Sequence, residues 1–480
     1  MYLFNSFKKM TLIKSISGIR GTIGGRSGEG LSPVDIVKFT AAYCSTLPLR
    51  KPFPNGDRYK VVVGKDARIS GEMVENIVVG TLAACGVDVV KCGFASTPTT
   101  EMAVILSGAD GGIIITASHN PKQWNALKLL NDKGEFLTAL EGAQVLSCAD
   151  AEDFVFSDVD KIGTITEKDF TDAHLDAVLS LEAVDTEAIR KAGFTVVVDA
   201  VNSVGGIIMP RLLKRLGVRC IPLNCNPTGE FAHNPEPLPA NLRELSETVV
   251  REGADLGISV DPDVDRLAFI CENGEPFVEE YTLVSVADYI CSLAEKQGRD
   301  IVTVSNLSSS RALQDVTEAH GGTYYPSAVG EVNVTTLMHE KGAIIGGEGN
   351  GGVIYPAIHS GRDAMVGTAL FLSNLAHKKM TVSALKATYP AYEIVKNKIT
   401  LSDNNLIDKI LSSLQKSFPE GVADTRDGVK ISFPAQRKWV HLRKSNTEPI
   451  IRIYAEAPTA AEATALADSV IAMAKKTIEG

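Results

Sequence analysis

The feature that most constrains the fold of this chain is an alternation of strand-like and helix-like segments, which recurs in three successive units. In the first unit, the apolar run YKVVVG precedes a helix that we expect from about Glu72 to Gly86, a glycine placed to end it. The second unit contains FTVVVDA, RLLKRLG, VRCIPLN, LRELSETVVREG and ADLGISVD. The third contains DIVTVSN, SSRALQDVTEAHGG and GAIIGGE. Strands separated by helices predict α/β domains with largely parallel sheets.

The end of the chain has a different pattern. Short strand-like segments (GVKISF, WVHLRKS and IIRIYAEA) alternate with charged segments and lead into an alanine-rich helix, PTAAEATALADSVIAMAKKTI. This order predicts a smaller α+β domain. Because 480 residues are too many for one core, we expect about three or four domains. We place them at residues 10–167, 168–275, 276–388 and 389–480.

Composition excludes several classes of protein. The net charge of -10, without a long basic run, disfavours binding to nucleic acid or to an anionic membrane surface. The sequence contains no secretory signal and no apolar run of membrane-spanning length, so we expect a cytoplasmic protein. The eight cysteines are scattered and form no CxxC pair, which indicates reduced thiols rather than disulfides or a zinc site.

The first candidate functional loop, ASHNP, follows the strand-like run GGIIIT. In parallel α/β sheets, ligands bind beyond the carboxyl ends of the strands, so polar residues directly after an apolar run are informative. The small residues permit a tight turn that holds the Ser118 hydroxyl at the strand end, as a nucleophile or as a phosphorylated serine. The same residues also fit an ordinary turn before proline. Lys128 is a mobile cation that can return to this loop.

The second loop, DPDVDR, places Asp261, Asp263 and Asp265 at alternate positions, followed by Arg266. Three carboxylates this close repel one another unless a cation lies among them, and oxygen ligands favour magnesium or calcium. An EF-hand is excluded because Arg266 stands where that loop needs glycine and because the flanking segments are strand-like. The loop therefore predicts a divalent-metal site, in preference to a solvated acidic turn.

The third loop, GGEGNGG, contains Glu348 and Asn350 among glycines. No lysine follows the glycines, so the loop is not a Walker-type phosphate loop. A carboxylate and an amide on a bare backbone suit hydrogen bonding to neighbouring hydroxyl groups, as on a sugar.

The fourth loop, RKSNTEP, combines a guanidinium, two hydroxyls, an amide and turn-prone backbone N–H groups. Arginine supplies paired donors and consecutive N–H groups supply the rest, so this set suits a dianionic phosphate. A β-turn with a capping serine is the alternative. The candidate phosphate ligands are Arg443, Ser445, Asn446 and Thr447, with Arg452 in support.

Together, the four loops resemble the signature segments of the α-D-phosphohexomutase family, which includes phosphoglucomutase, phosphomannomutase and phosphoglucosamine mutase. The resemblance covers essentially the whole chain after about Thr11. SISGIRG, with Arg20, resembles the family's N-terminal loop, GKDAR its next strand and loop, and TASHNP its phosphoserine loop. GEGNGG and GEVNV are most similar to the phosphoglucosamine mutase-like branch. The fold implied is four domains around a central cleft: three similar α/β domains with mixed sheets and a smaller C-terminal α+β domain of TATA-binding-protein-like build.

The resemblance also implies an activity. Members of the family are isomerases that move a phosphoryl group between C6 and C1 of a hexose phosphate. A phosphoserine, here at Ser118, donates to the substrate and is regenerated from a bound bisphosphate, so hexose 1,6-bisphosphate is the expected activator. Magnesium is expected to be held by that phosphate and by Asp261, Asp263 and Asp265. The partner is a phosphosugar, and we expect a monomer or a homodimer.

The resemblance assigns roles to further residues. Arg20 and Arg266 add cationic stabilisation, and His119 or Lys128 handles the proton of the reacting hydroxyl. Glu348 would bind the sugar hydroxyls. The chain departs from bacterial relatives by having Asn350 and Gly352 where serine and histidine are common, so an acid/base histidine is missing there. The identity of the sugar stays open, as glucosamine, glucose, mannose or N-acetylglucosamine phosphate.

Two other functions remain as alternatives. A phosphotransferase of the haloacid-dehalogenase type would use Asp261 as a covalent nucleophile, which explains DPDVD but leaves Ser118 and the Arg443 loop without a role. A phosphosugar-binding protein without activity would keep the same loops for sensing. An intact serine beside an intact aspartate triplet argues against that second alternative.

Overall fold

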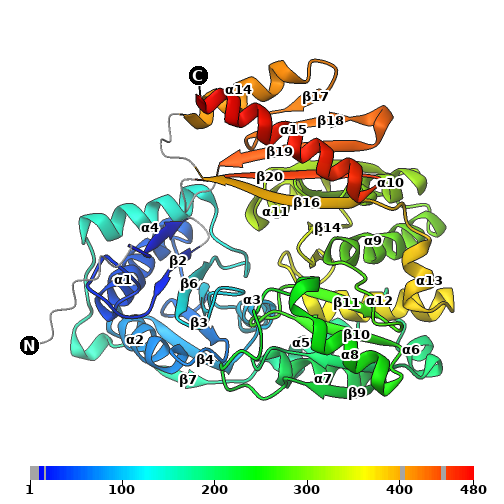
Figure 1. The fold of residues 1–480 in the computed structure, drawn as a ribbon. Coiled ribbons are helices and arrows are strands. Elements are labelled where there is room, and N and C mark those ends of the chain that lie inside the picture. The colour runs from blue at the N-terminus through cyan, green and yellow to red at the C-terminus, as the bar shows by residue number, and fades with distance from the viewer. Residues whose placement is uncertain (1–9, 16–17, 401–405, 445–449, 480) are drawn as a thin grey trace, which may run out of the picture. The chain divides into compact units, whose positions relative to one another are not determined.

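The computed structural model describes residues 10–15, 18–400, 406–444 and 450–479. The chain forms two compact units, whose elements are coloured from blue to red along the sequence in Figure 1. Unit one contains the described residues up to Val278 together with Gly352–Val382. Unit two contains Glu279–Gly351 together with the described residues from Ser383 onward. The chain therefore leaves unit one after Val278, returns to it for Gly352–Val382 and then leaves it again.

The first sheet of unit one is mixed, with strand order β1-β2-β6-β5-β3-β4-β7. Its strands are β1 Ile13–Ser15, β2 Gly18–Thr22, β3 Lys60–Lys65, β4 Asp88–Phe94, β5 Gly111–Ile115, β6 Trp124–Leu130 and β7 Ile165–Glu167. Strands β5, β3, β4 and β7 run parallel, as the sequence predicts. Strand β6, which the apolar pattern did not reveal, is antiparallel to both β5 and β2. It carries Lys128, opposite Ile114 of β5.

Helices cover both faces of this sheet. They are α1 Pro33–Arg50, α2 Gly71–Ala84, α3 Thr97–Ser107 and α4 Ala139–Ala151. Helix α1 begins with Ser32 as N-cap and proline in the first turn. Val61 and Val63 of β3 pack into the core that includes α1, α2 and α4, whereas Val62 packs into the core on the side of α3. The apolar run in β3 is continuous because both of its faces are buried.

The second sheet of unit one has the strand order β11-β10-β8-β9. Strands β8, β9 and β10 are parallel, and β11 is antiparallel to β10. The strands are β8 Thr195–Asp199, β9 Arg219–Leu223, β10 Leu256–Val260 and β11 Leu267–Cys271. The helices of this part are α5 Thr171–Leu179, α6 Thr186–Ala192, α7 Gly205–Leu216 and α8 Arg243–Glu252, with 3-10 turns at Val159–Lys161 and Pro239–Asn241. The returning segment of unit one adds β15 Gly352–Ile354 and α12 Ala364–Lys378, which packs against α5 and α6.

Unit two begins with a third α/β arrangement. Its strands β13, β12 and β14 pair in parallel, in that order. Its elements are α9 Glu279–Lys296, β12 Val302–Asn306, α10 Ala312–Ala319, β13 Thr323–Ser327, α11 Glu331–Lys341 and β14 Ile345–Glu348. The strands predicted in DIVTVSN and GAIIGGE are therefore β12 and β14.

The C-terminal part of unit two is the predicted α+β domain. An antiparallel sheet, in the order β16-β20-β19-β18-β17, packs on helices α14 and α15, which lie together in Figure 1. The elements are α13 Val382–Ala387, β16 Glu393–Thr400, α14 Leu406–Ser417, β17 Val422–Asp424, β18 Val429–Phe433, a 3-10 turn at Pro434–Gln436, β19 Lys438–Lys444, β20 Ile450–Ala457 and α15 Ala460–Glu479. This domain, with the mixed α/β sheets before it, confirms the predicted fold class.

Two expectations from composition can be compared with the structure. All eight cysteines are free thiols, as expected. Within the described part of the chain, no helix combines the length and the apolar character needed to cross a membrane.

Candidate functional site

The serine loop leaves the end of β5 in a strained conformation. Ser118 has a φ of 47°, in the left-handed region that residues other than glycine rarely adopt. Its N–H donates to Thr116 Oγ1 at 2.9 Å, and its Oγ donates to Asp261 Oδ2 at 2.6 Å. Such strain persists only where the surroundings fix the backbone, and it is typical of functional sites. The structure thus brings the serine directly to the aspartate loop.

Arg68 holds the serine loop in place. Its buried guanidinium donates to the carbonyl oxygens of Ser118, Asn120, Pro121 and Trp124, the last three at 2.8, 2.9 and 3.0 Å. Its Nε donates to Asp66 Oδ2 at 3.0 Å, and the same carboxylate oxygen accepts from Thr116 Oγ1 at 2.6 Å. Burial raises the pKa of Asp66 to about 6, although Arg68 acts in the opposite direction. The planar fork of arginine is needed here because a single-centre cation cannot reach so many carbonyls.

The aspartate loop is the connection between β10 and β11. Asp261, Asp263 and Asp265 are fully buried, with one carboxylate oxygen of each within 4.8 Å of the others. Burial, together with repulsion from the other two carboxylates, raises the pKa of Asp261 well above its ordinary value. Burial also opposes ionisation of Asp263, but the ammonium of Lys128 outweighs it and lowers the pKa of that group. The loop therefore gathers negative charge that needs cations.

The carboxylates have the donor atoms that a hard divalent cation requires. Among the residues that the structure describes, no hydrogen-bond donor reaches Asp263 Oδ1 or Asp265 Oδ1, although both atoms are buried. Buried carboxylate oxygens without a partner are costly unless an ion supplies the missing interaction. An all-oxygen set of this kind fits magnesium or calcium better than a metal that prefers nitrogen or sulfur.

Fixed cations lie beside the same carboxylates. Lys128 Nζ is 2.6 Å from Asp263 Oδ2 and 3.2 Å from Asp265 Oδ2. The sequence suggested a mobile cation, but Lys128 lies on strand β6 and its ammonium is held by these two aspartates. Burial acts against its charge, yet the two aspartates raise the pKa of Lys128 above its ordinary range. Arg362 Nη2 donates to Asp265 Oδ2 at 2.8 Å, and Thr97 Oγ1 donates to Asp263 Oδ2 at 2.6 Å.

His119 lies between the serine and several guanidiniums. Its Nδ1 is 3.3 Å from Ser118 Oγ. Burial, and then the charges of Arg266, Arg362 and Arg20, lower the pKa of His119 well below its ordinary value, so its ring is neutral near neutral pH. Arg20 and Arg266 repel each other. Burial first, and then this repulsion, lower the pKa of Arg20. A phosphate dianion would relieve this repulsion.

Arg266 is positioned by the aspartate loop itself. Its backbone N–H donates to Asp261 Oδ1 at 3.1 Å, as does the N–H of Asp265 at 3.2 Å. Its guanidinium Nη1 lies 3.3 Å from Glu236 Oε1. The serine loop, the aspartates and all of the predicted catalytic cations therefore belong to unit one.

The predicted sugar-binding loop lies in unit two, at the end of β14. Glu348 is buried, and its Oε1 accepts from Asn306 Nδ2 at 2.8 Å and from the Gly330 N–H at 3.2 Å. Asn350 Nδ2 is 3.4 Å from Glu348 Oε2. Gly349 lies between them, and a Cβ there would stand 1.8 Å from Glu280 Oε2, so that side chain or the loop would have to move. Glu348 is thus held in a fixed orientation.

The phosphate-loop arginines form a row across the C-terminal sheet. Arg443 of β19 pairs with Arg452 of β20, which pairs with Lys398 of β16. Directly opposed residues on neighbouring strands lie on one face, where like charges repel unless an anion joins them. Arg443 Nε is also 3.2 Å from Asp427 Oδ2. Three predicted ligands lie outside the described residues: Ser445, Asn446 and Thr447.

Several functional candidates were missed from the sequence. Arg68 had a signal, since GKDAR follows a buried strand and matches a family segment, but nothing showed that it holds the serine loop. Thr97 and Arg362 had a weaker signal, as polar residues at or just before helices α3 and α12. Lys398 lies in the segment KNKIT, and only the strand pairing places it beside Arg452.

Comparison with known proteins adds independent information. Four family models match in order: phosphoglucomutase/phosphomannomutase α/β/α domain I over residues 12–155, domain II over 172–274, domain III over 279–392, and the C-terminal domain over 398–473. A phosphoglucomutase/phosphomannomutase from Thermococcus kodakarensis is 35% identical over 465 residues, or 96% of this chain and 99% of the relative. A probable phosphoglucosamine mutase from Methanopyrus kandleri is 31% identical over 471 residues, covering 96% and 98%.

The fold is also similar to a solved structure. A phosphoglucomutase/phosphomannomutase family protein from Burkholderia thailandensis superposes with a TM-score of 0.81 and 24% identity, covering 98% of each chain. The ordered domain matches and the full-length relatives confirm the resemblance predicted from the four loops. The chain belongs to the phosphoglucomutase/phosphomannomutase family.

Proposed function

We propose that this chain is a phosphohexomutase that interconverts hexose 6-phosphates and hexose 1-phosphates, with Ser118 carrying the transferred phosphoryl group. The observation that carries the proposal is the position of Ser118 Oγ, 2.6 Å from Asp261 Oδ2 in a strained and clamped loop. A hydroxyl held beside buried carboxylates, with guanidiniums nearby, is suited to accept and donate a phosphoryl group.

The protonation states assign different roles to the two candidate proton carriers. Lys128 keeps its proton because two aspartates raise its pKa, so it offsets negative charge and does not act as a base. His119 is neutral and lies 3.3 Å from Ser118 Oγ, so it can accept the proton of a reacting hydroxyl at Nδ1. A dianionic phosphate beside the ring would raise its affinity for that proton. We therefore assign the proton transfer to His119.

The aspartates are the proposed magnesium ligands. Asp261, Asp263 and Asp265 would hold the ion together with the phosphate on Ser118, and the unpartnered Oδ1 atoms of Asp263 and Asp265 fit this role. When bound, magnesium offsets negative charge on the phosphoryl group. Thr97, Lys128 and Arg362 keep the carboxylates oriented through their hydrogen bonds.

Unit two supplies the proposed contacts with the rest of the substrate. Glu348, fixed by Asn306 and Gly330, would bind two sugar hydroxyls. Arg443 and Arg452, with Lys398 beside them, would bind the phosphate that is not reacting. Because the two phosphates exchange places during the reaction, one such site serves both half-reactions. Hexose 1,6-bisphosphate is the proposed activator, since it can phosphorylate an unmodified Ser118.

The test is turnover by the purified protein with magnesium and a trace of hexose 1,6-bisphosphate. We expect interconversion of the 1- and 6-phosphates, and its loss in Ser118→Ala. The matched control is Ser180→Ala, which removes an exposed hydroxyl bonded to the Ala177 carbonyl and should retain activity. Turnover in Ser118→Ala equal to that of the wild type would overturn the proposed role of Ser118.

The same preparation separates the two alternatives. Protein incubated with labelled bisphosphate should carry acid-stable phosphate on the peptide that contains Ser118. Phosphate that is sensitive to hydroxylamine and lies on Asp261 would instead indicate a phosphotransferase of the haloacid-dehalogenase type. Binding of phosphosugar with neither labelling nor turnover would indicate a binding protein without activity.

The identity of the sugar can be determined by comparing substrates. The two full-length relatives carry different names, one a phosphoglucomutase/phosphomannomutase and the other a probable phosphoglucosamine mutase. We propose a phosphoglucosamine mutase, a phosphoglucomutase/phosphomannomutase, or one enzyme with both activities. Values of kcat/KM for glucosamine, glucose, mannose and N-acetylglucosamine phosphates, measured under identical activation, distinguish these cases.

A further inference from the structure

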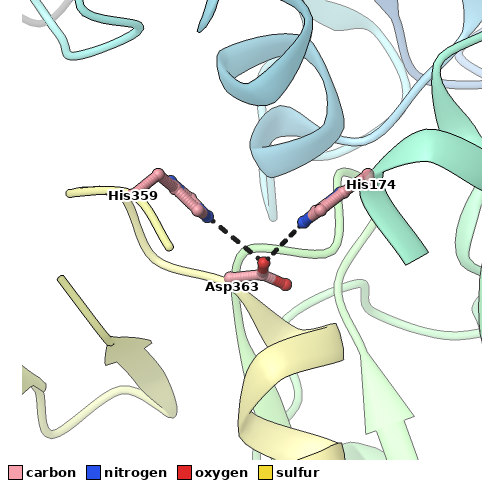
Figure 2. Close-up of side chains that lie close together, drawn as sticks. All are labelled: His174, His359 and Asp363. Atoms are coloured by element: carbon pink, nitrogen blue, oxygen red, sulfur yellow. Dashed lines mark hydrogen bonds and ion pairs between the residues drawn. The ribbon is translucent and has the colours of Figure 1, made fainter. Parts of the chain in front are cut away.

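A second group of possible metal ligands lies in unit one, apart from the aspartate loop. Figure 2 shows the imidazoles of His174 and His359 pointing toward the carboxylate of Asp363 from two sides. His174 Nε2 is 2.9 Å and His359 Nε2 is 3.2 Å from Asp363 Oδ2, and one ligand atom of each residue lies within 4.8 Å of the others. His174 belongs to α5, His359 follows β15, and Asp363 is the N-cap of α12.

The outer nitrogen of each imidazole has its own partner. His174 Nδ1 is 3.1 Å from Thr99 Oγ1, and His359 Nδ1 is 3.2 Å from Glu101 Oε2, with both partners on α3. The Gly361 N–H also donates to His359 Nδ1, at 3.1 Å. Histidines that bind a metal characteristically bond a carboxylate or another polar group through the second nitrogen, which orients the ring. Here that arrangement directs both Nε2 atoms to one point.

The spacing of the inner atoms suits a small divalent cation. Zinc binds histidine nitrogen and carboxylate oxygen at about 2.0–2.2 Å, which places tetrahedral ligand atoms about 3.3 Å apart. The observed separations of 2.9 and 3.2 Å from Asp363 Oδ2 differ from that value by only a few tenths of an ångström. Imidazole with carboxylate also favours zinc, iron, cobalt or nickel over magnesium.

The charges of this buried cluster are consistent with a cation. The side chains of His174, His359, Asp363 and Glu101 are each no more than 2% exposed. Buried carboxylates are stabilised by a nearby positive charge or by hydrogen-bond donors. A divalent cation held between the two imidazoles and Asp363 would supply such a charge inside the cluster.

We propose that His174, His359 and Asp363 bind a zinc-type divalent cation at a second, structural metal site, with Glu101 and Thr99 orienting the histidines. The site joins α3, α5 and the segment that leads into α12. Two residues on these segments also support the catalytic aspartates: Thr97 begins α3, and Arg362 lies directly before Asp363. The cation would therefore hold in place two side chains that orient Asp263 and Asp265.

The test uses zinc and the full-length chain. Protein treated with a chelator is dialysed, supplied with millimolar magnesium to occupy the aspartate site, and titrated with Zn²⁺, with metal content measured by mass spectrometry. We expect about one zinc per chain that magnesium does not displace. Co²⁺ bound in place of zinc should show the visible absorption of cobalt with nitrogen ligands. Cobalt bound only by the oxygens of the aspartate loop would give a different visible spectrum, so the spectrum tells the two sites apart.

Variants decide which residues bind the zinc. His359→Asn should abolish stoichiometric binding, and Glu101→Gln, which keeps all three ligands, should weaken it about 10–100-fold. His320→Asn is the matched control, because His320 also lies between two carboxylates, Asp288 at 3.0 Å and Glu295 at 2.7 Å, but is partly exposed. Asp261→Asn should retain the zinc. If His359→Asn does not fold, the Glu101→Gln affinity still decides the question.

Two results would overturn the proposal. One is a chelated wild-type chain that takes up no zinc in the presence of magnesium. The other is zinc binding that His359→Asn and Glu101→Gln leave unchanged. Either result would show that the cluster holds protons only. Neither would affect the proposed phosphohexomutase activity, which depends on Ser118 and is measured separately.

Discussion

Replacing Arg68 with lysine is expected to disable the serine loop while keeping the positive charge. The arginine donates to four carbonyl oxygens of that loop and to Asp66. Lysine has three donors on one nitrogen instead of five on a planar fork, so it can keep only some of these bonds. The perturbation therefore tests the geometry of the clamp and not its charge.

The size of the effect follows from the bonds that are lost. A hydrogen bond from a charged donor contributes about 1.5–3 kcal/mol, so the loss of two removes about 3–6 kcal/mol from the loop. The left-handed conformation of Ser118 costs about 1–3 kcal/mol and needs that support to persist. Once the clamp is weakened, the serine can relax away from Asp261. A displacement of about 1 Å at a reacting group lowers the rate about 100-fold.

The assay is steady-state conversion of hexose 1-phosphate to hexose 6-phosphate, together with thermal unfolding. We expect Arg68→Lys to lower kcat about 100-fold with little change in KM, because the proposed contacts with sugar and distal phosphate lie in unit two. The control is Arg58→Lys, since Arg58 also donates to a backbone carbonyl, that of Ile162 at 2.8 Å, but is exposed. A wild-type kcat in Arg68→Lys would refute this reasoning.

Two further predictions concern unit two. Burial lowers the pKa of His441 to about 4 from an ordinary value of 6.5, so between these pH values the unfolded chain binds a proton that the folded chain lacks. Stability should fall by up to about 3 kcal/mol as the pH drops through this window, and His441→Gln should flatten the dependence measured by urea unfolding at each pH. Gly349→Ala should raise the Kd for a phosphosugar about tenfold, the equivalent of one hydrogen bond between Glu348 and the sugar, because the new methyl displaces Glu280 or the loop. Isothermal titration with a phosphosugar checks this second prediction, and unchanged affinity would contradict it.

Much of the fold was predictable because its signals are local. The apolar strands β8, β10 and β12, the N-cap Ser32 and the antiparallel C-terminal strands each depend on a few consecutive residues. The aspartate loop was predictable for the same reason, since its three carboxylates lie within five consecutive positions. Strand β6 was missed because a strand without a clear apolar alternation is defined by its partners, here β2 and β5.

The composition of the site depended on contacts between distant parts of the chain. Lys128 and Asp263 are separated by 135 positions, and Arg68 and Ser118 by 50, so no local pattern relates them. The same holds for His174 and Asp363, which are 189 positions apart. The sequence by itself determined which chemical groups end each strand. Only the tertiary structure decided which of them meet, because burial pairs charges and fixes pKa values through neighbours that sequence order does not specify.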